Sequence, residues 1–168
     1  MTNQGSEREH RGESRIAQAL GEHWRDGLEA VVTAQLEQYG SLDAISMLQR
    51  ECIEASDTDR LMGLLGERAG LIEAIAQSAE RFAPYVEAWA EVEAALPEDV
   101  WNDLARRLEA IASIGDSISA RDAEDTVLIQ QNRDQIAGKL TGVTKSASAA
   151  KAYAGPRPSG ARYQDREA

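Results

Sequence analysis

The sequence is poor in the residue types that build β-sheets and many catalytic sites. Aromatic residues make up 5% of its 168 positions, and it contains one cysteine, two histidines and four prolines. The single cysteine excludes an internal disulfide and a metal site with several thiolates. Because Cys52 lies in an apolar helical pattern, we expect a small buried residue and not a nucleophile.

Long apolar runs and an excess of basic residues are absent as well. No stretch has the roughly 18 consecutive apolar residues of a membrane span, and the N-terminal stretch lacks the apolar core of a signal peptide. The formal net charge of −11 would make phosphate backbones and anionic membranes repel the molecule. These absences predict a cytoplasmic protein that neither binds nucleic acid nor inserts into membranes.

Groups suited to catalysis are scarce. The two histidines, His10 and His23, lie near an end that we expect to be disordered, so neither is placed to act as a base. Glu7 and His10 form one Glu-x-x-His pair, whereas a di-metal bundle needs two such pairs and two further glutamates. Two acidic clusters lack the glycine and terminal glutamate of a calcium loop, which predicts solvated helix faces. They comprise Asp57 and Asp59, and Asp122, Glu124 and Asp125. The sequence thus predicts no enzyme, no cofactor and no metal site.

The residues that are present favour helices. Hydrophobic residues make up 42% of the chain and are dominated by Ala, Leu and Ile, whereas Phe, Tyr and Thr, which favour strands, are scarce. We therefore predict an all-α fold. Residues 1–13 are polar and without periodicity, so we expect a disordered segment there, a single helical domain over 14–153 and a flexible tail over 154–168.

Apolar residues recur at helical spacing through the first two thirds of the chain. The segment from Ser14 to Tyr39 has one amphipathic face, and Gly40 with Ser41 predicts a helix end and a new start. A heptad frame follows, with Pro84 inside it, which predicts a kinked helix or two helices stacked end to end. Its positions are Leu61, Leu65, Arg68, Ile72, Ile75, Ala79, Phe82, Val86, Trp89, Glu93 and Leu96.

Leu96 and Pro97 mark the boundary to a last, long helix. Its apolar frame runs from Trp101 to Tyr153 in one phase and is interrupted by Asp122 and Asp125, which we expect in a solvated mid-section. The alternative is a short break over residues 119–124. Two long helices joined here should fold back antiparallel, with the earlier helices packed across them. The prediction is an elongated antiparallel helical hairpin or bundle with coiled-coil-like packing.

Three stretches are similar to a known family. In SDTDRLMGLLGERAGLIEAI an acid-flanked pair of leucines precedes a basic residue and an aliphatic pair: Asp59, Leu64, Leu65, Arg68, Leu71 and Ile72. In LIQQNRDQIAGKL an asparagine stands among aliphatic residues, and AYAGPRPSGARYQDREA places Tyr153 close to Gly155. This pattern, over about Leu42 to Ala168, resembles the FlgN-like flagellar export chaperones and the related FliT type. It departs from them at Ala154, where family members have Tyr next to Gly.

The resemblance implies a small chaperone that binds unassembled axial subunits of the hook-filament junction type and delivers them to the type III export gate without a cofactor. It implies that the C-terminal amphipathic helix binds the client and that Tyr153 docks on the export-gate protein. The client-binding positions would be Ile129, Asn132, Ile136, Leu140 and Val143.

The charge distribution fits such partners, and one alternative stays open. From Lys139 onward there are six basic residues and two acidic ones, so a positive end can steer toward an acidic partner surface. Apolar residues at helical spacing are also the core of any bundle, however. The alternative is a structural coiled-coil adaptor that forms a homodimer or higher homo-oligomer through Leu61 to Leu96 and has no export role.

Overall fold

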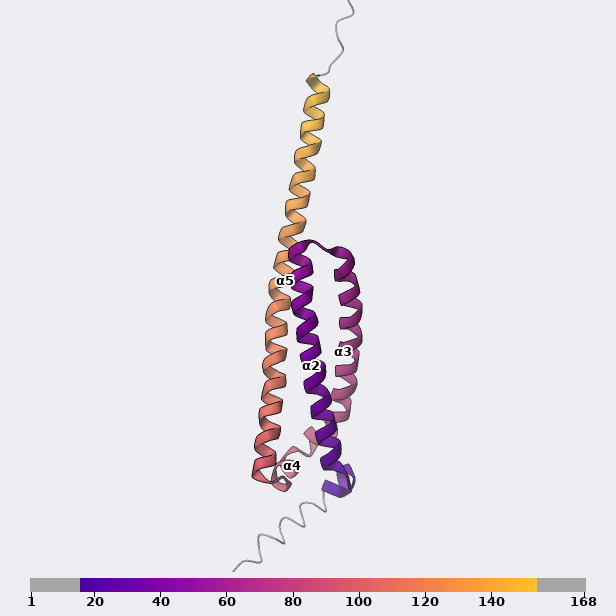
Figure 1. Ribbon diagram of the computed structural model, residues 1–168, viewed down its shortest axis with the longest axis vertical. Coiled ribbons are helices and arrows are strands. Elements are labelled where there is room, and N and C mark those ends of the chain that lie inside the picture. The colour runs from indigo at the N-terminus through magenta and orange to yellow at the C-terminus, as the bar shows by residue number, and fades with distance from the viewer. Residues whose placement is uncertain (1–15, 154–168) are drawn as a thin grey trace, which may run out of the picture. The chain divides into compact units, whose positions relative to one another are not determined.

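The computed structural model describes residues 16–153, with side chains up to residue 149, and in this part of the chain the regular secondary structure is helical. Its helices are α2 (Trp24–Ala55), α3 (Thr58–Glu87), α4 (Trp89–Ala95) and α5 (Glu98–Tyr153), preceded by a helical turn over residues 16–20 (Figure 1). The predicted all-α helical bundle is confirmed. The chain divides into two compact units after Thr126, here called unit 1 and unit 2. The predicted disordered segment 1–13 and the tail 154–168 lie outside the described residues.

Unit 1 is a three-helix bundle of α2, α3 and the first half of α5 (Figure 1). The ion pairs Glu29–Arg107 and Asp43–Arg121 join residues separated by the same 78 positions, so α2 and α5 run parallel and in one register. Arg68 in the first half of α3 pairs with Asp122, further along α5. Trp89, just after α3, packs against Trp101 near the start of α5, with the two rings tilted. The chain therefore folds back antiparallel at Leu96 and Pro97, as predicted.

The turn between α2 and α3 lies in the polar stretch 56–59. Ser56 has a left-handed backbone, with a φ of 56°. The N–H groups of Ser56 and Asp57 donate to the carbonyls of Ile53 and Cys52, a Schellman arrangement that satisfies the last carbonyls of α2. The Asp57 carboxylate then accepts from the N–H of Arg60 at 3.1 Å and caps α3. Two local motifs thus reverse the chain within a few residues.

Pro84 and Pro97 act differently in the described helices. Helix α3 continues through Pro84 and ends at Glu87, and Ala88 separates it from the short helix α4. Val92 of α4 is fully buried, so α4 closes the apolar end of unit 1. Leu96 is extended, as expected for a residue before proline, and Pro97 accepts the first hydrogen bond of α5, from Trp101. Pro97 thus ends one helix and starts the next, whereas Pro84 does not interrupt α3.

The predicted restart at Gly40 and Ser41 is wrong, because α2 continues through both residues. A glycine inside a helix costs only about 1 kcal/mol relative to alanine, and the helix on both sides of Gly40 buries apolar side chains. The Ser41 hydroxyl donates to the carbonyl of Glu37, one turn earlier, and so does not interrupt the helix. The break occurs earlier, at Gly21, whose φ of +92° is favourable only for glycine.

The core of unit 1 is apolar and aromatic at the end where α4 lies. It is formed by Ile16, Trp24, Leu28, Val31, Val32, Val92, Leu104 and Ile111, with the rings of Phe82, Tyr85, Trp89 and Trp101 packed against it. Phe82 and Trp89 meet edge to face at 6.0 Å between centroids, and Trp89 lies 5.3 Å from Trp101. The aromatic residues of unit 1 are thus concentrated where three helices and α4 meet.

The predicted frame of α3 is partly wrong. The inward positions are Leu61, Leu64, Arg68, Leu71, Ile75, Ser78, Phe82 and Tyr85. Four predicted core positions are instead exposed: Leu65, Ile72, Ala79 and Val86. An average spacing of 3.5 residues can begin with a step of three or of four, and apolar residues in this stretch satisfy both. The bundle uses the frame that begins with a step of three.

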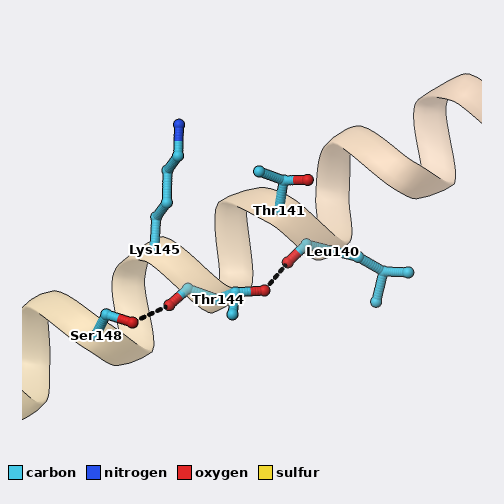
Figure 2. Close-up of a pocket in the computed structure, with 5 residues that line it drawn as sticks. All are labelled: Leu140, Thr141, Thr144, Lys145 and Ser148. Atoms are coloured by element: carbon cyan, nitrogen blue, oxygen red, sulfur yellow. Dashed lines mark hydrogen bonds between the residues drawn. The ribbon is translucent and has the colours of Figure 1, made fainter.

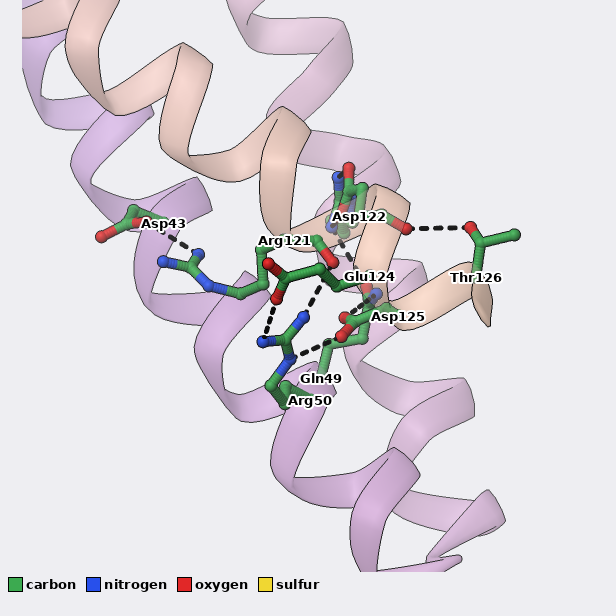
Figure 3. Close-up of polar contacts among 9 residues, drawn as sticks. Asp43, Gln49, Arg50, Arg121, Asp122, Glu124, Asp125 and Thr126 are labelled. Carbon is green, nitrogen blue, oxygen red and sulfur yellow. Dashed lines mark hydrogen bonds and ion pairs between the residues drawn. The ribbon is translucent and has the colours of Figure 1, made fainter. Parts of the chain in front are cut away.

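The opposite end of the core is held by ionic contacts, which Figure 3 shows. The side chain of Asp125 is only 2% exposed, and one of its oxygens accepts from Arg50 Nε at 2.7 Å. The other oxygen accepts from Gln49 Nε2 at 3.2 Å. A buried carboxylate needs such partners, since an unpaired charge in the interior costs several kcal/mol. Asp125 therefore ties α5 to α2.

A second carboxylate ties α5 to α3. Asp122 accepts from both terminal nitrogens of Arg68, a bidentate ion pair. Arg68 Nη1 also donates to Gln49 Oε1 at 3.1 Å. Gln49 therefore touches both ion pairs and links all three helices. We call Gln49, Arg50, Arg68, Asp122, Glu124 and Asp125 the ionic cluster.

The predicted solvated face at residues 122–125 is therefore wrong for Asp125, which is buried. Asp122 is 38% exposed although it pairs with Arg68, and Glu124 is 68% exposed although it accepts from Arg50 Nη1 at 2.7 Å. The hydrogen bonds to Asp125 and then Glu124 raise the pKa of Arg50 above its ordinary value. The alternative, a short break over residues 119–124, does not occur, since α5 is continuous there.

We expect Asp125→Ala to lower the free energy of unfolding by about 3 kcal/mol, because it leaves Arg50 Nε and Gln49 Nε2 without their acceptor. The matched control is Glu124→Ala, which removes an exposed partner of the same arginine and should cost under about 1 kcal/mol. Urea unfolding followed by circular dichroism measures both. Equal losses in the two variants would contradict the structural role of Asp125.

We expect Gly40→Ala to stabilise the protein by about 0.5–1 kcal/mol, since Gly40 lies inside α2 and a Cβ there meets no atom within 4 Å. Gly27→Ala should destabilise it, because the hydroxyl of Tyr85 occupies the place of the new Cβ and the Tyr85 ring is packed against the core. Thermal unfolding of the two variants compares them directly. A lower melting temperature for Gly40→Ala would argue against a continuous α2.

Candidate partner-binding surface

The predicted client-binding residues lie in unit 2, where α5 has an exposed apolar face. Ile129, Ile136, Leu140 and Val143 are between 49% and 67% exposed. At about 100° per residue, all four lie within roughly 60° of one another around the helix. We call these four residues the α5 stripe. Apolar side chains that are about half exposed or more, on one face of a helix, form a surface that a partner can cover.

The α5 stripe continues the periodicity of the core. Trp101, Leu108 and Gly115 lie seven residues apart and are partly buried in unit 1. Further steps of seven lead through Asp122 to Ile129, Ile136 and Val143. The same spacing therefore marks inward positions in unit 1 and exposed positions in unit 2. The sequence alone does not distinguish these two environments.

Unit 2 forms its helix by local interactions. The hydroxyls of Thr141, Thr144, Ser146 and Ser148 each donate to the carbonyl four residues earlier. Gln130 donates to Asp134 at 2.9 Å, also one turn away. Gly138 and Gly142 lower the helix propensity. Such a helix gains little from propensity, so a partner that covers its apolar face would stabilise it.

One edge of the α5 stripe is shown in Figure 2. Leu140, Thr141, Thr144, Lys145 and Ser148 lie on successive turns of one helix and form a shallow, open surface. Thr144 Oγ1 donates to the carbonyl of Leu140 at 2.6 Å, which satisfies the hydroxyl within the helix. Lys145 stands at this edge, and Lys139 is also exposed. An open apolar strip beside lysines suits an elongated partner such as a helix better than a small molecule.

The structure brings four of the six predicted site residues together. Asn132 is partly buried and lies at the side of the α5 stripe. Tyr153 is the last residue of α5, and its side chain lies outside the described part of the chain. Thr144, Lys145 and Ser148 were not predicted, because polar residues on a helix give no signal of which side a partner would use.

Away from the α5 stripe, the described chain offers few groups suited to other chemistry. Within residues 16–153 there is no group of three or more His, Cys, Asp or Glu side chains placed to hold a metal ion. Cys52 is buried, as predicted for a small core residue. A surface depression of about 300 Å³ lies between the turn at residues 16–20 and the junction of α3 and α4, bordered by Glu87 and Glu91. None of the helices described here combines the length and apolarity needed to cross a membrane.

Comparison with known proteins returned no match: no protein-family model, no curated protein and no solved structure resembles this chain closely enough to assign it. The similarity to the FlgN-like chaperones therefore stays a prediction from three stretches of sequence.

We expect backbone amides over residues 131–149 to exchange with solvent at least about 100-fold faster than those over 104–122. The first group belongs to a helical segment with almost entirely exposed side chains, whereas the second includes Leu104, Ile111 and Ile118 in the core. Hydrogen exchange read by mass spectrometry tests this. Equal protection in both segments would mean that the α5 stripe is already covered in the free protein.

Proposed function

We propose that this protein is a cytoplasmic chaperone of the flagellar type III export kind, which binds a terminal helix of an unassembled axial subunit along the α5 stripe. The observation that carries the proposal is the exposure of Ile129, Ile136, Leu140 and Val143 on one helix face. The likeness of the sequence to FlgN-like chaperones supplies the class of client, the hook-filament junction subunits. The proposed action is binding and delivery, with no catalytic step and no cofactor.

The strength of such binding can be bounded. Full burial of an aliphatic side chain is worth about 1.5–3 kcal/mol, and roughly half of that remains to be gained at each position of the α5 stripe. Four positions thus supply on the order of 3–6 kcal/mol before the cost of ordering the partner. This favours a weak and reversible complex, which suits a carrier that must release its client.

The second step of the proposed function concerns the end of α5. Tyr153 would dock on the export-gate protein, the role that the family resemblance gives it. Its neighbourhood in the sequence is basic, with Lys145 and Lys151 before it and Arg157 after it. Complementary charge raises the rate of encounter with an acidic partner more than it raises affinity. A gate surface rich in carboxylates would meet this end of the protein efficiently.

One observation favours the alternative function, a homo-oligomeric adaptor. Leu65, Ile72 and Val86 of α3 are exposed and lie at heptad spacing, as a coiled-coil interface would require. The adaptor would be a dimer or larger oligomer in solution, whereas the chaperone would bind its client one to one. Light scattering of the purified protein separates the two.

We expect Ile136→Glu with Leu140→Glu to weaken binding to a purified hook-filament junction subunit by at least about tenfold. Val127→Glu is the matched control, because Val127 is also exposed but lies nearly opposite Ile136 around the helix. Calorimetric titration gives the affinities, and circular dichroism verifies that the helix persists. If Val127→Glu weakens binding as much as the double variant, the α5 stripe is not the client site.

A chain that ends at Ala150 tests the docking step in the same titrations. It keeps the α5 stripe and should bind the client normally, but it should lose affinity for the cytoplasmic domain of the export-gate protein. Unchanged binding to the gate domain would remove Tyr153 from the proposal and leave the client site standing.

A further inference from the structure

Helix α3 carries a second apolar face, distinct from the one that packs in the core. Its eight positions follow steps of three and four residues, and every one of them is apolar and exposed. They are Met62, Leu65, Ala69, Ile72, Ala76, Ala79, Ala83 and Val86. We call this face the α3 seam. Its four large side chains, Met62, Leu65, Ile72 and Val86, are between 41% and 64% exposed.

The α3 seam has the geometry of a helix–helix interface. None of its eight heptad positions is polar. They span 25 residues of α3, a length of about 36 Å along the axis. The seam is rotated by roughly 100° around α3 from the inward face of Leu64 and Arg68, at about 100° per residue. Four of its members are alanines, which let a second backbone approach closely. The α3 seam can therefore be buried while the three-helix core stays intact, if one more helix lies beside α3.

An acidic border runs along the outer edge of the α3 seam. Glu73, Glu80 and Glu87 lie seven residues apart, and each is one helical turn away from an alanine of the seam. All three are exposed, and none of them forms an ion pair within the described residues. In a helix pair, residues at this position face the flanking residues of the partner and decide which partner is accepted. The border thus selects a partner with basic flanks.

The sequences at the two ends of the chain do not have this chemistry. Met1 is the one large apolar residue among residues 1–15, and residues 154–168 contain Pro156 and Pro158 and no apolar repeat. The α3 helix of a second copy of this chain is also a poor partner for the α3 seam. In an antiparallel pair of α3 seams the glutamates of one copy face those of the other, which is destabilising. In a parallel pair the glutamates of one copy would face positions such as Ile75 and Phe82 of the other copy. These residues lie on the inward face and offer the glutamates no opposite charge.

We propose that the α3 seam binds one amphipathic helix of another protein, with aliphatic residues at heptad spacing and Lys or Arg along the flanks that meet Glu73, Glu80 and Glu87. The bound helix completes a four-helix arrangement with α2, α3 and α5. This surface is separate from the α5 stripe, and its role does not depend on the export function.

The test uses the full chain and two synthetic helical peptides of about four heptads, with Leu at both core positions. One peptide has Lys at all flanking positions and the other has Glu, so that like charges keep each peptide from pairing with itself. Fluorescence anisotropy of the labelled peptides gives the dissociation constants. We expect the Lys peptide to bind at least about tenfold more tightly than the Glu peptide.

Variants then locate the binding. Leu65→Gln with Ile72→Gln should weaken binding of the Lys peptide by at least about tenfold, since both side chains are exposed and their loss leaves the core intact. The matched control is Met47→Gln with Val100→Gln, two similarly exposed apolar residues outside the α3 seam, which should bind as the parent chain does. Glu73→Lys with Glu80→Lys should reverse the preference in favour of the Glu peptide.

Three results would overturn the proposal. The first is undiminished binding by the Leu65→Gln, Ile72→Gln variant. The second is loss of Lys-peptide binding through Ile136→Glu and Leu140→Glu instead, which would assign the peptide to the α5 stripe. The third is a dimer, seen by light scattering, that the Leu65→Gln, Ile72→Gln variant dissolves, because it would give the α3 seam to a second copy of this chain.

Discussion

The buried carboxylate of Asp125 is the constraint on which the arrangement of unit 1 depends. A charge so completely buried is tolerated only where partners meet it at hydrogen-bond distance, and here they are Arg50 and Gln49 of α2. Gln49 also accepts from Arg68 of α3, which holds Asp122. Hydrogen bonds are directional, so this geometry exists in only one register of three helices. An apolar interface of the same size would tolerate sliding by a turn far more easily.

The two ends of unit 1 therefore have different tasks. The end near α4 buries most of the aromatic and aliphatic side chains and supplies the bulk of the hydrophobic stabilisation. The ionic cluster at the other end contributes less net energy, because burying charges costs nearly what their attraction returns. Its contribution is specificity: it orients α5 with respect to α2 and α3. The ion pairs Glu29–Arg107 and Asp43–Arg121 repeat the same parallel register outside the ionic cluster.

The two candidate surfaces differ in charge, and this difference matters for partner choice. The α5 stripe lies among lysines, whereas the α3 seam is bordered by glutamates. Both are apolar strips on single helices, so their shapes discriminate little between partner helices. Flanking charges then decide between partners, because like charges placed opposite each other disfavour the wrong partner. Under the two proposals, each surface accepts a helical partner whose flanking charges are opposite to its own.

The helical class, the boundary at Pro97 and the periodicity of the α5 stripe follow from the sequence, because they depend on local propensity, proline geometry and spacing. Local signals alone wrongly end a helix at Gly40, since the burial that offsets a glycine comes from residues on other helices. They also assign Asp125 to a solvated face, because its partner Arg50 is 75 positions away. Which of two interleaved heptads on α3 faces inward, and that Leu65 and Ile72 are exposed, is likewise decided only in the tertiary structure. Spacing defines the faces of a helix, but only the packing of neighbouring helices determines which face is covered.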